Sequence, residues 1–138
     1  MNEQVIQKRI LDYLSNCGYW LVKIITCNRA GCMDIIACAP GGLFVGIEVK
    51  YDRNTPSDLQ LFAIQEVLAN GGVAFVAWSV EEVLIYLSHY GLPTVPKTLG
   101  DASGQQNEYR RDPAFRTGAL IARCQVSVEA EHSPHRKL

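Results

Sequence analysis

Two strand-like segments joined by a Pro-Gly-Gly turn constrain the fold of this chain more than any other feature. Residues 34–39 and 43–50 are rich in apolar and β-branched side chains, and Pro40-Gly41-Gly42 lies between them. This pattern predicts a β-hairpin. A helical pattern over 56–70 and a short apolar strand over 73–78 follow. An antiparallel hairpin followed by a helical crossover indicates a mixed sheet covered by helices.

Three further segments complete the pattern on either side of the hairpin. Residues 3–16 have apolar side chains at helical spacing, with Gln7 expected on the outer face. Residues 19–26 are typical of a strand, and Ser79 is a suitable N-cap for a last helix over 80–90. The order α-β-β-β-α-β-α predicts an α/β domain with a mixed central sheet flanked by helices. The helix over 56–70 is expected to bury Leu59, Phe62, Ala63 and Val67.

The character of the chain changes after Gly91. Residues 91–113 contain many Gly, Pro, Ser, Gln and Asn residues and almost no apolar periodicity, whereas 118–128 regain some. We therefore expect a folded unit over 1–90 and a C-terminal appendage over 91–138 that is extended or partly disordered. With 138 residues, 48% hydrophobic and 20% charged, the chain is long enough for one globular core.

Composition excludes some classes of protein and limits others. The chain has no apolar run long enough to cross a bilayer and no basic-then-apolar start, which predicts a cytoplasmic protein without a membrane partner. Its five cysteines match no zinc spacing, so we expect free thiols. Residues 1–90 carry six basic and nine acidic side chains, a net −3. A nucleic-acid partner would therefore need a local basic surface or bound cations.

The chemistry begins with Glu48-Val49-Lys50. Side chains alternate along a strand, so Glu48 and Lys50 share one face, and Gly46 leaves room beside the carboxylate. Taken alone, the pair is well explained as a surface salt bridge that contributes ~0–1 kcal/mol. Asp34 opens the neighbouring strand and is placed to meet Glu48 across the hairpin, although an aspartate there could simply cap a turn. Two close carboxylates repel unless a cation lies between them, and such oxygen ligands suit Mg²⁺ or Mn²⁺.

Other residues could complete such a site. The backbone carbonyl of Val49 could supply a further oxygen ligand, and Lys50 could orient a water or neutralise charge on a phosphate. Gln60, early in the second helix, could reach that water or phosphate, or could be an ordinary solvated residue. Glu3 lies at the start of the first helix, where the helix dipole also favours an acid.

Several of these segments carry a resemblance to a known family. The runs 31–38, 40–50 and 56–60 resemble the VRR-NUC branch of the PD-(D/E)XK nucleases. Residues 3–14 are similar to its first motif and 71–81 to its closing strand and helix, so the resemblance covers about residues 3–88 in order. It implies a restriction-endonuclease-like αβββαβ core, as in Holliday-junction resolvases. Stand-alone members of this branch, many from phages or prophages, are often homodimers.

The resemblance also implies roles for individual residues. Asp34 and Glu48 would be the metal ligands and Lys50 the catalytic lysine. Gln60 would be the glutamine of the following helix, and Glu3 the acid of the first helix. The chain would then be a Mg²⁺- or Mn²⁺-dependent endonuclease that hydrolyses DNA phosphodiester bonds, with branched or junction DNA as an expected substrate.

One departure leaves an alternative open. Met33 stands where the family usually has proline, which would preset the loop entering the strand but supplies no ligand. A catalytically inactive nucleic-acid- or protein-binding module on a nuclease scaffold is therefore a second hypothesis, and an α/β domain with mere surface ion pairs is a third. DNA contacts are expected from Lys23, Arg29 and Arg53. The appendage could add Arg110, Arg111, Arg116 and Arg123.

Overall fold

The computed structural model describes residues 1–97. The greater part of the predicted appendage, with the four arginines named above and the segment 118–128, lies outside the described residues. In the described part the helices and strands follow the predicted order α-β-β-β-α-β-α. They are α1 (Glu3–Asn16), β1 (Trp20–Lys23), β2 (Ile35–Cys38), β3 (Phe44–Val49), α2 (Asp58–Ala69), β4 (Val73–Ala77) and α3 (Val80–His89).

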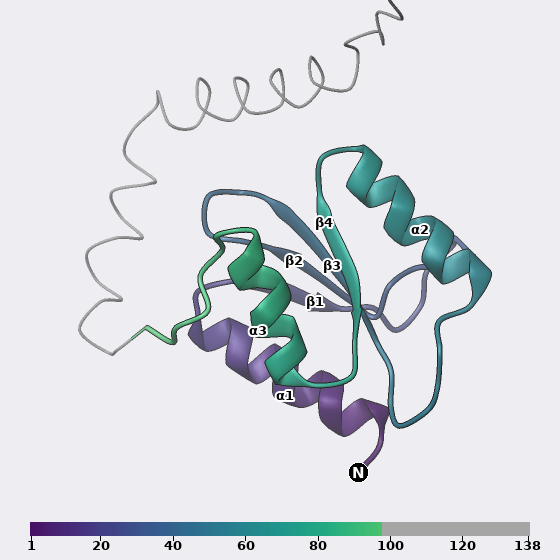
Figure 1. Ribbon diagram of the computed structural model, residues 1–138, viewed down its shortest axis with the longest axis horizontal. Coiled ribbons are helices and arrows are strands. Elements are labelled where there is room, and N and C mark those ends of the chain that lie inside the picture. The colour runs from purple at the N-terminus through teal and green to yellow at the C-terminus, as the bar shows by residue number, and fades with distance from the viewer. Residues whose placement is uncertain (98–138) are drawn as a thin grey trace, which may run out of the picture. The chain divides into compact units, whose positions relative to one another are not determined.

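The strands form one mixed sheet in the order β1-β2-β3-β4 (Figure 1). β1 pairs with β2 and β2 with β3 in antiparallel fashion, whereas β3 and β4 are parallel. The predicted hairpin is therefore confirmed. Its turn needs glycine, because Gly41 and Gly42 have φ of 98° and 94°, a region that other residues rarely adopt.

Helices cover both faces of this sheet. α1 and α3 contact each other and share one face, and α2 lies on the other face against β3 and β4 (Figure 1). The core between the sheet and the α1–α3 layer contains Ile10, Ile35, Ile47 and Leu87, which are completely buried. The predicted α/β fold with a mixed sheet flanked by helices is confirmed.

Two expectations about helix faces were wrong. Gln7 was expected on the outer face of α1, but it is buried, because it lies one turn before the buried Ile10–Leu14 stripe. Leu59 and Phe62 were expected to be buried and are each 57% exposed. Ala63 is buried and Val67 half-buried as expected, and Ile64 is buried in place of Leu59 and Phe62. The rotation of α2 about its axis therefore differs from the one that hydrophobicity alone suggested.

The chain continues to contact this fold after α3. The Tyr13 hydroxyl donates to the Thr94 carbonyl at 3.0 Å, and the Tyr19 hydroxyl donates to the Pro93 carbonyl at 2.8 Å. The Lys97 amide donates to the Asn16 carbonyl at 2.8 Å. The boundary expected at residue 90 stays a prediction. Within residues 1–97, none of the helices combines the length and apolar character that a membrane span requires.

Candidate active site

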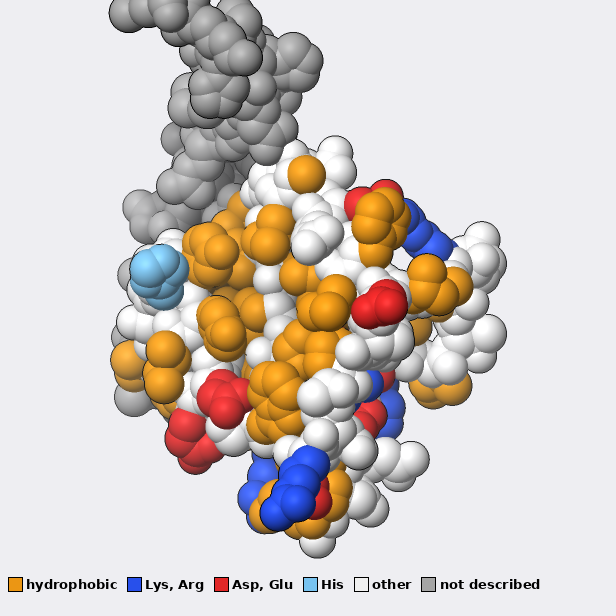
Figure 2. Space-filling model, turned by 45° about the vertical axis from the view of Figure 1, so that its right-hand side comes forward, with side chains coloured by type: hydrophobic (Ala, Val, Ile, Leu, Met, Phe, Trp, Pro, Cys, Tyr) orange, Lys and Arg blue, Asp and Glu red, His pale blue; other side chains and the backbone are white. Residues whose placement is uncertain are grey.

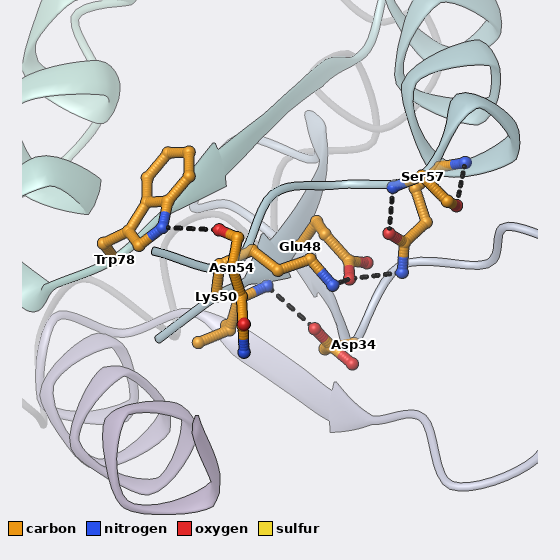
Figure 3. Close-up of polar contacts among 8 residues, drawn as sticks. Asp34, Glu48, Lys50, Asn54, Ser57 and Trp78 are labelled. Carbon is orange, nitrogen blue, oxygen red and sulfur yellow. Dashed lines mark hydrogen bonds and ion pairs between the residues drawn. The ribbon is translucent and has the colours of Figure 1, made fainter. Parts of the chain in front are cut away.

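The candidate site lies where β3 ends beside the start of β2. The register pairs Ile35 with Ile47, so Asp34 is level with Glu48 on the adjacent strand. Asp34 Oδ2 accepts a hydrogen bond of 2.8 Å from the Val49 amide, which fixes its side chain against β3 (Figure 3). The hairpin therefore brings the two predicted carboxylates together, as their spacing indicated.

The carboxylate of Glu48 is almost completely buried, with 1% of the residue exposed. Its Oε1 accepts two hydrogen bonds, one of 2.8 Å from Lys50 Nζ and one of 2.6 Å from Gln60 Nε2 (Figure 3). Its Oε2 is buried and has no hydrogen-bond partner among the described residues. One oxygen of this carboxylate is thus saturated and the other is left without a donor.

Electrostatics around Glu48 favour an additional positive charge. Burial raises the pKa of Glu48 to about 7; the hydrogen bond from Lys50 opposes this shift and the charge of Asp34 adds to it. Burial alone would lower the pKa of Lys50, but the hydrogen bond and charge of Glu48 outweigh it and raise that pKa. The charge of Glu3 acts in the same direction, which places the first turn of α1 near the lysine.

Gln60 is held in place by the start of α2. Ser57 is the N-cap, and its hydroxyl accepts from the Gln60 amide at 3.2 Å, while Gln60 Oε1 accepts from the Ser57 amide at 2.8 Å. This capping box leaves Gln60 Nε2 free to donate to Glu48. Because Gln60 faces Glu48, the stripe that continues from it through Ala63, Ile64 and Val67 is turned toward the sheet. The hydrogen bond between Gln60 and Glu48 therefore explains why Leu59 and Phe62 point away.

The structure thus places all five predicted catalytic residues in one region. Hydrogen bonds join Glu48 to Lys50 and Gln60, and Asp34 is bonded to the strand that carries them. Glu3 takes part only through its charge, without a hydrogen bond to the other four. Within residues 1–97, no group of three or more His, Cys, Asp or Glu side chains is arranged to hold a metal ion. The carboxylate donors are therefore the pair Asp34 and Glu48.

The three basic residues predicted to contact DNA differ in their surroundings. Arg29 forms an ion pair with Glu66 of α2. Lys23 lies at the end of β1 and lines a hollow together with Lys8 and Arg9 of α1. Arg53 is exposed in the loop that follows Lys50, and no salt bridge within residues 1–97 involves it. Among the described residues, Arg53 and Lys23 therefore have no ion-pair partner of the kind that Arg29 has.

Sequence reasoning missed two contacts that support the site. The Ser57-x-x-Gln60 spacing is the signature of a capping box and could have been recognised. Trp78 Nε1 donates to the Asn54 carbonyl at 3.0 Å and so ties the loop after Lys50 to the end of β4 (Figure 3). No local pattern signals that second contact, because it joins residues 24 positions apart.

Comparison with known proteins gives one informative likeness. No family model and no curated protein matches the chain. A solved structure described as "VRR_NUC domain" is similar with a TM-score of 0.56 and 26% identity, covering 64% of this chain and 96% of that one. The chain contains a VRR-NUC-like domain. The predicted family resemblance and the restriction-endonuclease-like fold are both confirmed.

Met33, which departs from the usual proline, is a packing residue of this VRR-NUC-like domain. It is 5% exposed and belongs to a small buried cluster with Ile64 of α2 and Ala74 of β4. Its side chain covers Gly46 closely: a β-carbon at residue 46 would lie 2.7 Å from Met33 Cε. The residue before Asp34 is therefore fixed by side-chain packing instead of a proline ring.

Proposed function

We propose that the VRR-NUC-like domain is a metal-dependent endonuclease that hydrolyses DNA phosphodiester bonds, with Mg²⁺ or Mn²⁺ as its cofactor. The observation that carries this proposal is Glu48 Oε2, a buried carboxylate oxygen without a hydrogen-bond partner among the described residues, beside a second carboxylate. Burying a charge without a partner is expensive, so such an atom calls for a cation. The likeness to a VRR_NUC domain supports a nuclease-type hydrolase at a coarse level.

The donors available fit Mg²⁺ or Mn²⁺ and not a softer metal. Asp34, Glu48 and the Val49 carbonyl would hold the ion, and all three offer oxygen ligands. With so few protein ligands, water would complete the coordination shell, as Mg²⁺ prefers. When bound, the ion would lower the pKa of a coordinated water and offset charge on the phosphate.

The protein's own residues orient and balance this chemistry. Gln60 and Lys50 hold Glu48 Oε1, so the unpaired Oε2 is the oxygen left free. The Lys50 side chain is 12% exposed, and its raised pKa keeps it a cation that can donate to a phosphate oxygen. The hydrogen bond from the Val49 amide holds the Asp34 side chain against β3.

DNA would be held by cations around this centre. Arg53 follows Lys50 in an exposed loop, and Lys23 lies beside Lys8 and Arg9, so both can contact phosphates without losing a partner. Arg29 would first have to leave Glu66. We propose branched or junction DNA as the substrate. Binding through phosphate contacts should weaken as the salt concentration rises, which distinguishes it from binding through base contacts.

Cleavage by the purified chain tests the proposal. We expect nicking of supercoiled plasmid and of a four-way junction in Mn²⁺, and none in EDTA. Lys50→Ala should lower the rate about 100-fold or more. Lys97→Ala is the matched control, because the Lys97 side chain lies against Gly18, beyond the C-terminal end of α1, whereas Glu3 at the other end of that helix is the part near the site. Equal rates for the wild type and Lys50→Ala would remove the catalytic assignment.

Metal binding separates a nuclease from an inactive module on the same scaffold. Asp34→Asn retains an oxygen that can accept from the Val49 amide, so the hairpin contact should survive while the charge is lost. Calorimetry should show Mn²⁺ binding to the wild type and none to Asp34→Asn. Unchanged Mn²⁺ binding in that variant would contradict the ligand assignment.

We also propose that the domain acts as a homodimer. Within residues 1–97, β4 is an edge strand made only of apolar residues, and it lies between α2 and α3. Both helices carry exposed apolar side chains, among them Leu61, Leu68, Ile85 and Tyr86. Hydrophobic side chains also gather on the face shown in Figure 2. An uncharged open edge favours pairing with a second copy. Light scattering should give a dimer for the wild type and a monomer for Ile85→Glu.

A further inference from the structure

A cavity beside α2 has no role in the site described so far. α2 packs against β3 and β4, and the cavity lies next to this contact, between α2 and the strands β2 and β3. Its volume is about 410 Å³, within the range of small-molecule sites. Most of its wall is apolar and comes from Met33, Ile36, Phe44, Ala63 and Val67. This hollow, the α2 cavity, has room for one flat ring system.

An aromatic ring forms one wall of the α2 cavity. Phe44 lines the cavity and is 39% exposed, so its ring is accessible to a bound molecule. Gly72, just before β4, lines the cavity beside it. A β-carbon at Gly72 would lie 3.4 Å from Phe44 Cδ1, so a larger residue there would crowd the ring. An accessible aromatic ring in such a wall is a stacking surface for another ring.

The polar groups of the α2 cavity offer both donors and acceptors. Arg29 and Glu66 form an ion pair, and both line the cavity together with Asn70. Asn70 Nδ2 donates to the Glu66 carbonyl at 2.7 Å, and its Oδ1 is a further acceptor. Because the charges of Arg29 and Glu66 offset each other, the cavity does not favour an anion. A neutral planar ring with donors and acceptors along its edge fits these surroundings, and a nucleobase is such a ring.

The α2 cavity adjoins the candidate active site along two strands. Met33, in its wall, directly precedes Asp34. Phe44 and Glu48 are four positions apart on β3, so they lie on the same face of the sheet and about 13 Å apart along the strand. This is the length of about four stacked nucleotides of DNA, and of fewer when the strand is extended. A strand bound at Asp34 and Glu48 can therefore reach the cavity a few nucleotides from the cut.

We propose that the α2 cavity binds one unpaired nucleobase of the DNA strand that the active site cuts, which rests on the proposed nuclease function. The base stacks on Phe44, and Arg29, Glu66 and Asn70 face its polar edge. A base inside a duplex is stacked between its neighbours and enters such a cavity only when it is unpaired or flipped out. The cavity therefore directs cleavage to unpaired nucleotides beside a branch and disfavours perfect duplex DNA.

Photocrosslinking of the full chain tests this assignment. A forked DNA with two single-stranded arms carries 5-iododeoxyuridine at one position at a time, counted from the branch point, and is bound in Ca²⁺ instead of Mn²⁺. Near-ultraviolet light couples this base to an aromatic ring on which it is stacked. We expect crosslinking to Phe44 from one or two arm positions and none from the duplex. Phe44 is the only aromatic residue of the tryptic peptide 30–50, so mass spectrometry identifies the site.

Binding affinity, measured by fluorescence anisotropy, gives a second readout. An abasic nucleotide at the crosslinking position should weaken binding to the wild type about tenfold, because stacking is lost there, and should matter much less elsewhere in the arms. Phe44→Leu should lose both this position dependence and the crosslink. Phe62→Leu is the matched control, because Phe62 is 57% exposed on α2 and does not line the cavity. It should keep both.

The opposite results are equally clear. Bound DNA that crosslinks only to other peptides, or abasic nucleotides that weaken binding equally at every arm position, would overturn the base site and leave the cavity to a protein side chain. Cleavage in Mn²⁺ without a crosslink on Phe44 overturns the base site alone. A crosslink on Phe44 without cleavage in Mn²⁺ overturns the nuclease activity and supports base binding, so the two failures are distinguishable.

Discussion

The Met33 side chain packs closely over Gly46 beside the candidate site, and Gly46→Ala tests this contact. Gly46 has no positive φ, so alanine there is opposed by sterics alone. The added methyl would lie 2.7 Å from Met33 Cε and closer still to Sδ, and Met33 is 5% exposed with little room to withdraw. Overpacking of this kind costs about 1–3 kcal/mol of unfolding free energy.

A double-mutant cycle identifies Met33 as the cause. Met33→Ala removes a buried side chain and should itself cost about 2–5 kcal/mol. In Gly46→Ala/Met33→Ala the new methyl occupies space that the thioether has left. The double variant should therefore be more stable than the sum of the two losses predicts, by about 1–3 kcal/mol.

Urea unfolding followed by tryptophan fluorescence measures these differences, with Trp20 and Trp78 as the probes. Gly41→Ala is the matched control. A β-carbon there meets nothing within 4 Å, so the φ of 98° is its only cost. It should be additive with Met33→Ala. Additivity of Gly46→Ala with Met33→Ala within about 0.5 kcal/mol would refute the contact.

Three further predictions concern the site and its supports. Gln60→Ala should lower the unfolding free energy by about 1–2 kcal/mol and weaken Mn²⁺ binding in calorimetry, whereas Ser57→Ala should cost about 1 kcal/mol and leave Mn²⁺ affinity nearly unchanged. Lys50→Met should cost about 3–5 kcal/mol in urea unfolding, because Glu48 stays buried without its cation, and Glu48→Gln/Lys50→Met should recover most of that loss. Mn²⁺ at about 100 times its dissociation constant should raise the unfolding free energy of the wild type by about 2.7 kcal/mol, measured by thermal unfolding. An equal increase in Glu48→Gln/Lys50→Met would contradict the assignment of Glu48 as a metal ligand.

Local signals explain why the order of elements could be predicted from sequence. The Pro40-Gly41-Gly42 turn specifies the hairpin through glycines that adopt positive φ, and Ser79 caps α3 as expected. The hairpin then fixes its own register, which places Asp34 level with Glu48. These features depend on neighbours in the chain, and the sequence contains all of them.

Helix rotation could not be predicted in the same way. Leu59 and Phe62 are more apolar than Gln60, so a ranking by hydrophobicity turns the wrong face of α2 toward the sheet. The hydrogen bond between Gln60 and Glu48 decides the rotation, and it requires the tertiary position of β3. Gln7 is a similar case on α1, since its burial depends on how α1 rests on the sheet.

The site combines both kinds of information. The shared face of Glu48 and Lys50 follows from strand alternation alone, and on that basis the pair resembles a weak surface salt bridge. Burial changes this interpretation, because Glu48 is 1% exposed and one of its two carboxylate oxygens has no hydrogen-bond partner within residues 1–97, which is unfavourable for stability. Proteins retain such unfavourable arrangements chiefly where function requires them. The unsatisfied Glu48 Oε2 is therefore a stronger argument for a cation than the presence of Asp34, Glu48 and Lys50 in sequence, since a purely structural pair would have evolved a donor for it.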